Sequence, residues 1–146
     1  MELDDTFFMK QALKLAIQAS EEDEVPIGAV VVVNNRIIGK GYNQSVRLGD
    51  CTAHAEMLAL TAAFQSLNSS VLDECKIYVT VEPCPMCAGA LSWSRIGEVI
   101  YGASEPKSGF SHFTPSLLHP KTTVKQGILE DECSMVMRDF FSSKRD

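Results

Sequence analysis

The chain has 146 residues, 45% of them hydrophobic, with 13 Lys and Arg against 19 Asp and Glu and a formal net charge of −6. Because this length and hydrophobic content are enough for one core, we expect residues 1–146 to form a single domain. The negative net charge argues against a general nucleic-acid binder.

The acidic residues are concentrated at the two ends of the chain. Residues 1–24 hold seven acids and two bases, and residues 130–146 hold five acids and three bases, whereas residues 25–129 hold seven acids and eight bases. A neutral or basic site in the middle of the chain is therefore compatible with the acidic total.

Several features predict a cytoplasmic protein without a membrane segment. The N-terminus is acidic where a signal peptide would be basic. The longest apolar run, Ile27–Val33, is far too short to span a bilayer. The five cysteines fit a reducing compartment, where a cysteine pair indicates metal binding or catalysis before a disulfide.

Hydrophobic periodicity predicts alternating helices and strands along the chain. Amphipathic or apolar helical patterns cover residues 4–22, 53–67 and 129–141, and another helix begins within residues 82–94. Runs rich in β-branched residues predict five strands, over residues 27–33, 36–42, 76–81, 98–102 and 124–128. Residues 43–51 and 102–123 are expected to be loops. This order predicts an α/β fold, in which a five-stranded mixed sheet has helices on both faces.

A histidine and a carboxylate, His54 and Glu56, stand at the head of the third predicted helix, in the stretch TAHAE. The rest of that helix is apolar, and burying an unpaired charge costs several kcal/mol. Another group nearby must therefore offset the cost of burying His54 and Glu56.

A cysteine pair supplies such a group. Cys84 and Cys87 follow the third predicted strand, and Pro85 suits the first position of the next helix. The two thiolates can then converge at a helix N-terminus, and His54 can complete a set of three ligands. Three Cys/His ligands with a fourth position for water are typical of a catalytic zinc ion.

Glu56 needs a separate role, because side chains two apart on a helix point to nearly opposite sides. His54 and Glu56 can share one site only if His54 lies at or just before the first turn. Glu56 would then lie beside the metal-bound water as general base and acid, without binding the metal.

Other interpretations of the same residues remain open. The C-x-x-C could be a redox pair, or the zinc could be structural with a fourth protein ligand, for which the candidates are Cys51, Cys75, Cys133, His112 and His119. As loop or core residues these five need no metal, and Cys75 and Cys133 are expected in the core. The combination H-x-E with P-C-x-x-C is more specific than either half, and it is the signature of zinc nucleobase deaminases.

With these motifs, the chain resembles the cytidine/deoxycytidylate deaminase superfamily, and within it the bacterial tRNA-specific adenosine deaminases. The resemblance runs over nearly the whole chain, through EVPIGAVVV, DCTAHAEMLAL, IYVTVEPCPMCAGAL, SRIGEVIYGA and the closing DFF. It implies a three-layer cytidine-deaminase-like fold. It also implies hydrolytic deamination of adenosine to inosine at the wobble position of a tRNA anticodon loop, by a homodimer with one Zn²⁺ per subunit.

The resemblance also implies roles for particular residues. His54, Cys84 and Cys87 match the zinc ligands, and Glu56 matches the proton shuttle. Asn43 matches a contact to the target base, and the pocket wall is matched by Val25, Pro26 and Ile27. The backbone N–H groups of Ala55 and Cys84 match contacts around the base and the hydroxide.

The chain departs from the family pattern near the expected RNA contacts. Cys51 replaces the usual proline before TAHAE, and Glu105 replaces an aspartate that contacts RNA. Residues 109–123 differ from the best-known bacterial form. Lys107 is expected to meet a phosphate, as are Lys121, Lys125, Lys144 and Arg145, and Phe141 is expected to stack on a base or to pack within the protein.

Two further functions are compatible with the sequence. A free nucleobase or nucleoside deaminase, such as a guanine deaminase, shares EPCPMC, and the negative net charge favours it. The other is a non-catalytic binding module that is stabilised by zinc.

Overall fold

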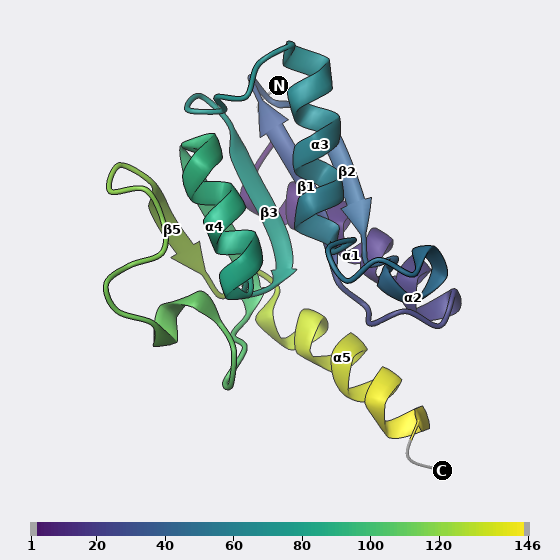
Figure 1. The fold of residues 1–146 in the computed structure, drawn as a ribbon. Coiled ribbons are helices and arrows are strands. Elements are labelled where there is room, and N and C mark those ends of the chain that lie inside the picture. The colour runs from purple at the N-terminus through teal and green to yellow at the C-terminus, as the bar shows by residue number, and fades with distance from the viewer. Residues whose placement is uncertain (1–2, 145–146) are drawn as a thin grey trace.

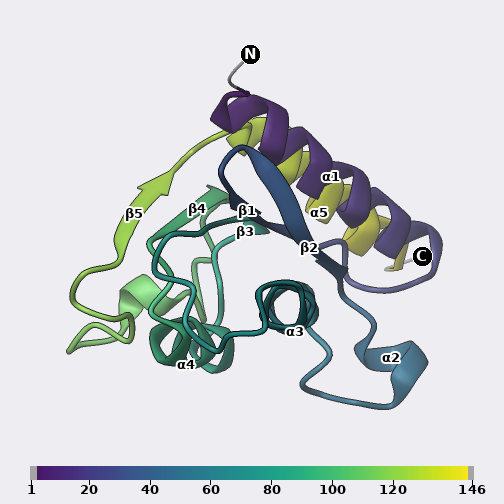
Figure 2. The same cartoon turned by 90° about the horizontal axis from the view of Figure 1, so that it is seen from above.

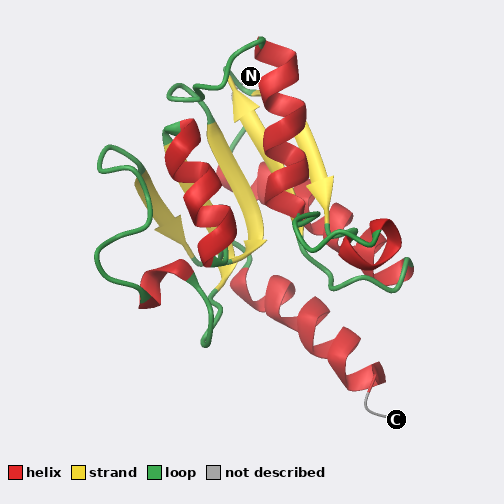
Figure 3. Cartoon of the chain, in the orientation of Figure 1, coloured by secondary structure: helices red, strands yellow, loops and turns green. Residues whose placement is uncertain are grey.

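The structure is a computed structural model that describes residues 3–144, which form one mixed five-stranded sheet with helices on both faces (Figures 1 and 3). The strands are β1 (Gly28–Val33), β2 (Arg36–Tyr42), β3 (Lys76–Val81), β4 (Glu98–Ala103) and β5 (Thr123–Gln126). The helices are α1 (Asp5–Glu21), α2 (Ser45–Leu48), α3 (Ala55–Leu67), α4 (Pro85–Ser94) and α5 (Glu130–Lys144), with a 3-10 turn at Phe110–His112. The predicted fold class is confirmed. Within residues 3–144, none of the helices has the length and apolar character needed to cross a membrane.

The strands lie in the order β2-β1-β3-β4-β5. Strand β1 is antiparallel to β2 and β3, whereas β3, β4 and β5 are parallel. The turn between β1 and β2 consists of Asn34 and Asn35, both at positive φ (48° and 66°), which suits a tight hairpin. The crossover from β3 to β4 runs through α4, so the C-terminal end of β3 leads directly into a helix N-terminus.

The helices form two layers, one on each side of the sheet. Figure 2 shows α1 and α5 on one face and α3 and α4 on the other. One core cluster lies under α3 and α4 and includes Leu60, Ile77 and Leu91. The other lies under α1 and α5 and includes Phe8 and Tyr78. Cys75 and Cys133 are buried in these clusters, as the sequence predicts.

Two glycines of β2 bring this strand unusually close to α3. A Cβ on Gly39 would clash with the carbonyl oxygen of Ala59, and one on Gly41 with that of Ala55. Only glycine permits such a backbone approach. The close contact places the N-terminus of α3 beside the end of β2, where the site described below is formed.

The segment 43–51 differs from the prediction, because it is not all loop but contains α2. This four-residue helix has no cap from its own segment. The buried carboxylate of Glu24 accepts hydrogen bonds from the N–H groups of Val46 (3.1 Å) and Arg47 (2.7 Å) instead. A short helix that depends on a tertiary contact leaves no local signal in the sequence.

The last helix is longer than predicted, since α5 continues past Phe141 to Lys144. Lys144 pairs with Asp23, and its ammonium lies 5.5 Å from the centre of the Phe140 ring. These contacts to the end of α1 and within α5 stabilise the extra turn. The strand predicted at 124–128 runs from Thr123 to Gln126.

Candidate active site

The N-termini of two helices meet near the C-terminal end of β3. His54 is the N-cap residue of α3, with φ −80° and ψ 156°, and Cys84 is the N-cap residue of α4, with φ −75° and ψ 170°. Pro85 occupies the first turn of α4, as predicted, and Cys87 follows within it. The extended backbone at both caps turns the His54 and Cys84 side chains away from their helices and toward each other.

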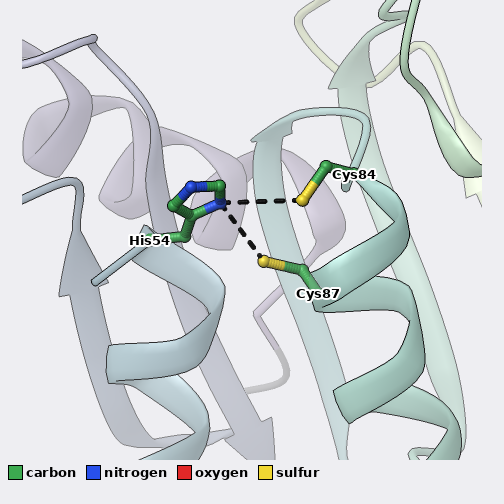
Figure 4. Close-up of side chains that lie close together, drawn as sticks. All are labelled: His54, Cys84 and Cys87. Atoms are coloured by element: carbon green, nitrogen blue, oxygen red, sulfur yellow. Dashed lines mark hydrogen bonds between the residues drawn. The ribbon is translucent and has the colours of Figure 1, made fainter. Parts of the chain in front are cut away.

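These caps bring a histidine and two cysteines together (Figure 4). The His54 Nδ1 lies 3.6 Å from the Cys84 Sγ and 3.5 Å from the Cys87 Sγ. The three donor atoms lie within 4.8 Å of one another. Among residues 3–144, the cluster includes none of the candidates for a fourth ligand, which were Cys51, Cys75, Cys133, His112 and His119. His112 lies exposed in its loop, with its Nε2 3.0 Å from the Glu105 carbonyl oxygen.

Hydrogen bonds between the three groups shift their pKa values in opposite directions. The hydrogen bond from the Cys87 thiol lowers the pKa of Cys84 well below its usual range, and the hydrogen bond with His54 lowers it further. The same bond to Cys84, together with burial, raises the pKa of Cys87. The hydrogen bond to Cys84 raises the pKa of His54. Cys84 is therefore a thiolate at neutral pH, the form that binds metal.

Glu56 lies in the first turn of α3 and is buried, with 3% of its surface exposed. Within the described chain its Oε1 has no hydrogen-bond partner. Burial raises the pKa of this carboxyl group to about 7. A buried carboxylate oxygen without a partner needs a proton donor or cation nearby, and three N and S donors are the set that zinc prefers. The residues present therefore fit a zinc ion.

Asn43 connects the end of β2 to the start of α3. Its side chain is buried, and its Oδ1 accepts a 2.9 Å hydrogen bond from the N–H of Ala55. The Asn43 N–H donates to the carbonyl oxygen of Ile27 (3.2 Å). The family resemblance implies that the Ala55 N–H contacts the substrate. In this structure the same N–H donates to the Asn43 side chain.

The predicted pocket wall precedes β1. Pro26 is buried, and Val25 and Ile27 are half-buried. Because Asn43 bonds both to Ile27 and to Ala55, the structure brings this wall to the N-terminus of α3. Asn43 and the wall residues therefore lie beside the first turn of α3, which also carries Glu56.

The remaining predicted contacts lie beside a separate cavity of about 620 Å³. Phe141 and Glu105 both line it, whereas Lys107 is exposed outside its lining. One wall of this cavity is formed by the ends of β3 and β4 and by the loop after β4, and the other wall is formed by α5. The lining residues are Val81, Ala103, Ser104, Glu105, Pro106, Ser134, Met137, Arg138, Phe141 and Ser142. Phe140, the neighbour of Phe141, is buried in contrast.

Some of the cations proposed to meet phosphate have protein partners. Lys125 pairs with Asp5 at 2.7 Å and Lys144 pairs with Asp23, while Lys107 and Lys121 are exposed. Arg145 lies outside the described residues. The Glu105 carboxylate accepts hydrogen bonds from the N–H of Ser108, the Ser108 hydroxyl (2.7 Å) and the N–H of Lys107 (3.0 Å). The Ser108 N–H is the main cause that holds the pKa of Glu105 below its usual value.

Two buried glutamates near the site were not identified from the sequence. Glu24 directly precedes the wall residues, and Glu82 lies two positions before Cys84. Both are almost completely buried, and each accepts two backbone hydrogen bonds. For Glu82 the available signal was an acidic residue directly after the buried strand β3. Glu24 lies four residues before β1 and leaves no such signal.

The fold and this site define a zinc-dependent deaminase, and residues 2–103 match the profile described as the cytidine and deoxycytidylate deaminase zinc-binding region. The chain belongs to this family. It is 42% identical to the tRNA-specific adenosine deaminase of Agrobacterium fabrum over 96% of this chain and 95% of that protein. It is also 42% identical to the tRNA-specific adenosine deaminase of Bacillus subtilis, over 97% of this chain and 91% of that one.

Solved structures agree with this assignment. A structure from a study of A-to-I editing by tRNA:A34 deaminases at the wobble position of transfer RNA superposes with a TM-score of 0.84 at 40% identity, covering 90% of this chain and 99% of that one. A guanine deaminase from Bacillus subtilis superposes with a TM-score of 0.67 at 38% identity, covering 70% of this chain and 66% of that one.

Proposed function

We propose that this chain, acting as one domain, hydrolyses the 6-amino group of adenosine at the wobble position of a tRNA anticodon loop, giving inosine and ammonia. The observation that carries the proposal is the cluster of His54, Cys84 and Cys87 with the unpartnered carboxylate oxygen of Glu56 next to it. The near-full-length similarity to tRNA-specific adenosine deaminases supports tRNA as the substrate.

The three clustered side chains are assigned as the metal ligands. His54 provides Nδ1 and the two cysteines provide Sγ atoms, so three protein ligands leave one position for a reactant. A zinc ion held there supplies Lewis acidity, which makes water nucleophilic at neutral pH.

Glu56 is assigned as the group that moves protons. Its Oε1 accepts a proton from the attacking water and delivers it to the adenine ring nitrogen N1, next to the carbon under attack. Glu56 then takes the remaining proton from the hydroxyl group on C6 and delivers it to the exocyclic nitrogen, so that the C6 carbonyl forms, ammonia leaves and the carboxylate is restored. A carboxyl group with a pKa near the working pH is suited to both transfers.

Asn43 and the wall residues are assigned to binding of the base. With its Oδ1 held by the Ala55 N–H, Asn43 can offer its Nδ2 as a donor to an acceptor on the purine. Val25, Pro26 and Ile27 give an apolar surface against which a flipped base can lie. The wall excludes water from one side of the base.

The cavity between β4 and α5 supports an RNA substrate larger than a single base. It combines the Phe141 ring with the cation of Arg138 and the loop residue Glu105. Aromatic rings stack on unpaired bases and cations meet phosphates, so this composition suits nucleotides that flank the target. The exposed ammonium of Lys107 is assigned to the same surface.

We further propose a homodimer formed through the outer face of α4. Trp93, the single tryptophan, has 88% of its surface exposed, and Met86 lies seven residues earlier on the same face with 36% exposed. A surface tryptophan is typical of an interface. Because α4 also carries Cys87 near its N-terminus, a partner on this face would lie near the site.

A cytoplasmic location belongs to the same proposal. All five cysteines are unpaired, which suits a reducing compartment.

The test compares substrates on the zinc-loaded protein. An anticodon stem-loop with adenosine at the wobble position is incubated beside free adenosine, guanine and cytosine, and inosine and ammonia are measured. We expect deamination of the stem-loop, with the same stem-loop carrying guanosine at that position as the control. Guanine is included because of the similarity to a guanine deaminase. Deamination of a free base alone would overturn the tRNA assignment.

A further inference from the structure

The segment that carries the metal-binding cysteines is connected to the loop after β4 by one buried side chain, Glu82. Only 4% of Glu82 is exposed, although it is a charged residue. Its Oε1 accepts a hydrogen bond from the N–H of Glu105 (3.0 Å), and its Oε2 accepts one from the N–H of Ser111 (2.9 Å). Both oxygens therefore bind the same loop at two points six residues apart.

The backbone on either side of Glu82 strengthens this connection. The Glu82 N–H donates to the carbonyl oxygen of Ala103 (2.8 Å), and the N–H of Phe110 donates to the carbonyl oxygen of Pro83 (3.0 Å). Phe110 is buried, and its ring packs edge-on against Tyr101 with 6.0 Å between centroids. Residues 82–83, which lead directly to Cys84, thus contact both ends of the loop.

Gly109 shows that the loop is fitted to this carboxylate. A Cβ at position 109 would clash with the carboxyl carbon and both oxygens of Glu82. Because both oxygens are held by backbone N–H groups, the side chain cannot turn away without losing those bonds. The absence of a side chain at 109 therefore permits the loop to close over Glu82.

We propose that Glu82 is a positioning residue for the substrate: it fixes loop 104–112 relative to the segment Pro83–Cys84. This loop supplies Ser104, Glu105 and Pro106 to the cavity opposite α5. Glu82 thereby sets the distance between the metal-binding cysteines and the wall that meets the flanking nucleotides. The inference rests on the proposed function for the identity of the substrate, and on the structure alone for the connection between cysteines and loop.

The first test measures the loop directly, by hydrogen exchange and mass spectrometry on the zinc-loaded protein. Glu82→Ala removes both acceptors, and Glu82→Gln keeps the shape but replaces one acceptor by an amide N–H₂. We expect exchange in peptides spanning 104–112 to rise by at least about tenfold in the alanine variant, since the loss of each charge-assisted hydrogen bond supports about that factor, and less in the glutamine variant. Peptides from α1 and the zinc content should stay unchanged, and exposed Glu74→Gln is the matched control.

Gly109→Ala tests the same connection from the other side. We expect it to speed exchange in 104–112 when Glu82 is present, and to add little in the Glu82→Ala background, where the clashing carboxyl group is gone. Full additivity of the two changes, or unchanged exchange in both Glu82 variants, would overturn the proposal.

The kinetic readout uses the wobble-adenosine stem-loop. A positioning role predicts a KM raised on the order of tenfold with kcat nearly unchanged, because the loop contributes to binding and not to the chemical step. A fall in kcat alone would show instead that Glu82 acts through the metal-binding segment, contrary to the proposal. If the parent protein did not deaminate the stem-loop, the proposed function would fail, while the exchange result would still decide the role of Glu82.

Discussion

Asn43 caps the helix that carries Glu56: its Oδ1 accepts a 2.9 Å hydrogen bond from the N–H of Ala55, the first residue of α3. His54, the N-cap residue of this helix, makes no capping hydrogen bond with its own side chain, because its ring is turned toward the two cysteines. A side chain from the end of β2 therefore does what the N-cap residue cannot do while it faces the metal site.

Because Asn43 caps α3 through its Oδ1 and leaves its Nδ2 for the substrate, two substitutions of Asn43 should differ in their effects on stability and on activity. Asn43→Ala leaves a buried N–H without an acceptor and should lower the free energy of unfolding by about 1–2 kcal/mol. Asn43→Asp keeps an acceptor at the helix N-terminus, so it should retain most of that stability while losing the Nδ2 donor. Urea unfolding and stem-loop kinetics measure the two effects separately. If Asn43→Asp were as active as the parent, Asn43 would serve only as a cap.

Glu56→Ala should abolish turnover without loss of zinc. The carboxylate is not one of the three clustered donors, so zinc per chain should match the parent, while the deamination rate falls by about 10²–10⁴-fold or more. Removal of a buried carboxylate with one unpartnered oxygen should not destabilise the metal-free protein. Metal analysis, single-turnover kinetics and thermal unfolding check the three statements. An active Glu56→Ala variant would refute the assigned proton transfer.

Loss of the metal ligands should remove zinc and activity together. Cys84→Ser, Cys87→Ser and His54→Ala each delete one of three donors, and we expect zinc bound after dialysis to fall by at least about tenfold. Chelation of the parent should stop turnover, and added zinc should restore it. Exposed Cys51→Ser is the control and should keep its metal. Loss of zinc in that variant would show a fourth protein ligand.

Lowering the pH should remove the contribution that the ionised Asp5 carboxylate makes to the free energy of unfolding. Burial acts to raise the pKa of Asp5, but hydrogen bonds from Lys125 and Tyr78 outweigh it and hold the pKa below the usual value. Since the folded state has the lower pKa, this contribution is present above the unfolded pKa of about 4 and is lost as the pH falls through the folded pKa.

Asp5→Asn should therefore be less stable than the parent at pH 7, and the difference should shrink below about pH 4. Urea unfolding from pH 7 to pH 3 measures it. A difference that stays constant with pH would mean that ionised Asp5 does not stabilise the contact between α1, β3 and β5.

Trp93→Glu should convert the proposed dimer to a monomer, because a charge on the outer face of α4 would be buried without a partner. Sedimentation velocity gives the mass. Ile17→Glu is a matched control, since Ile17 is 44% exposed on α1, on the opposite face of the sheet. A parent protein that sediments as a monomer at micromolar concentration would contradict the dimer.

The sequence predicted the sheet and most helices because their signals are local. The β-branched run before the Asn34–Asn35 turn and the apolar pattern of α3 specify those elements within a few residues. The placement of His54 just before the first turn of α3 followed from the two-residue spacing to Glu56, and the structure confirms it. The short helix α2 was missed because its cap comes from Glu24, twenty-two residues away from Val46.

By itself, then, the sequence indicated the chemistry: H-A-E and P-C-P-M-C at two helix starts supply the donors and the carboxylate that are the signature of zinc nucleobase deaminases. The tertiary structure decided which side chains hold those helix starts in place. Asn43 caps α3, and Glu82 connects Cys84 to the loop 104–112, across contacts that join residues 12 and 23 or more positions apart. Such contacts depend on how the strands order themselves in the sheet, and local patterns of hydrophobicity and turn residues do not encode that order.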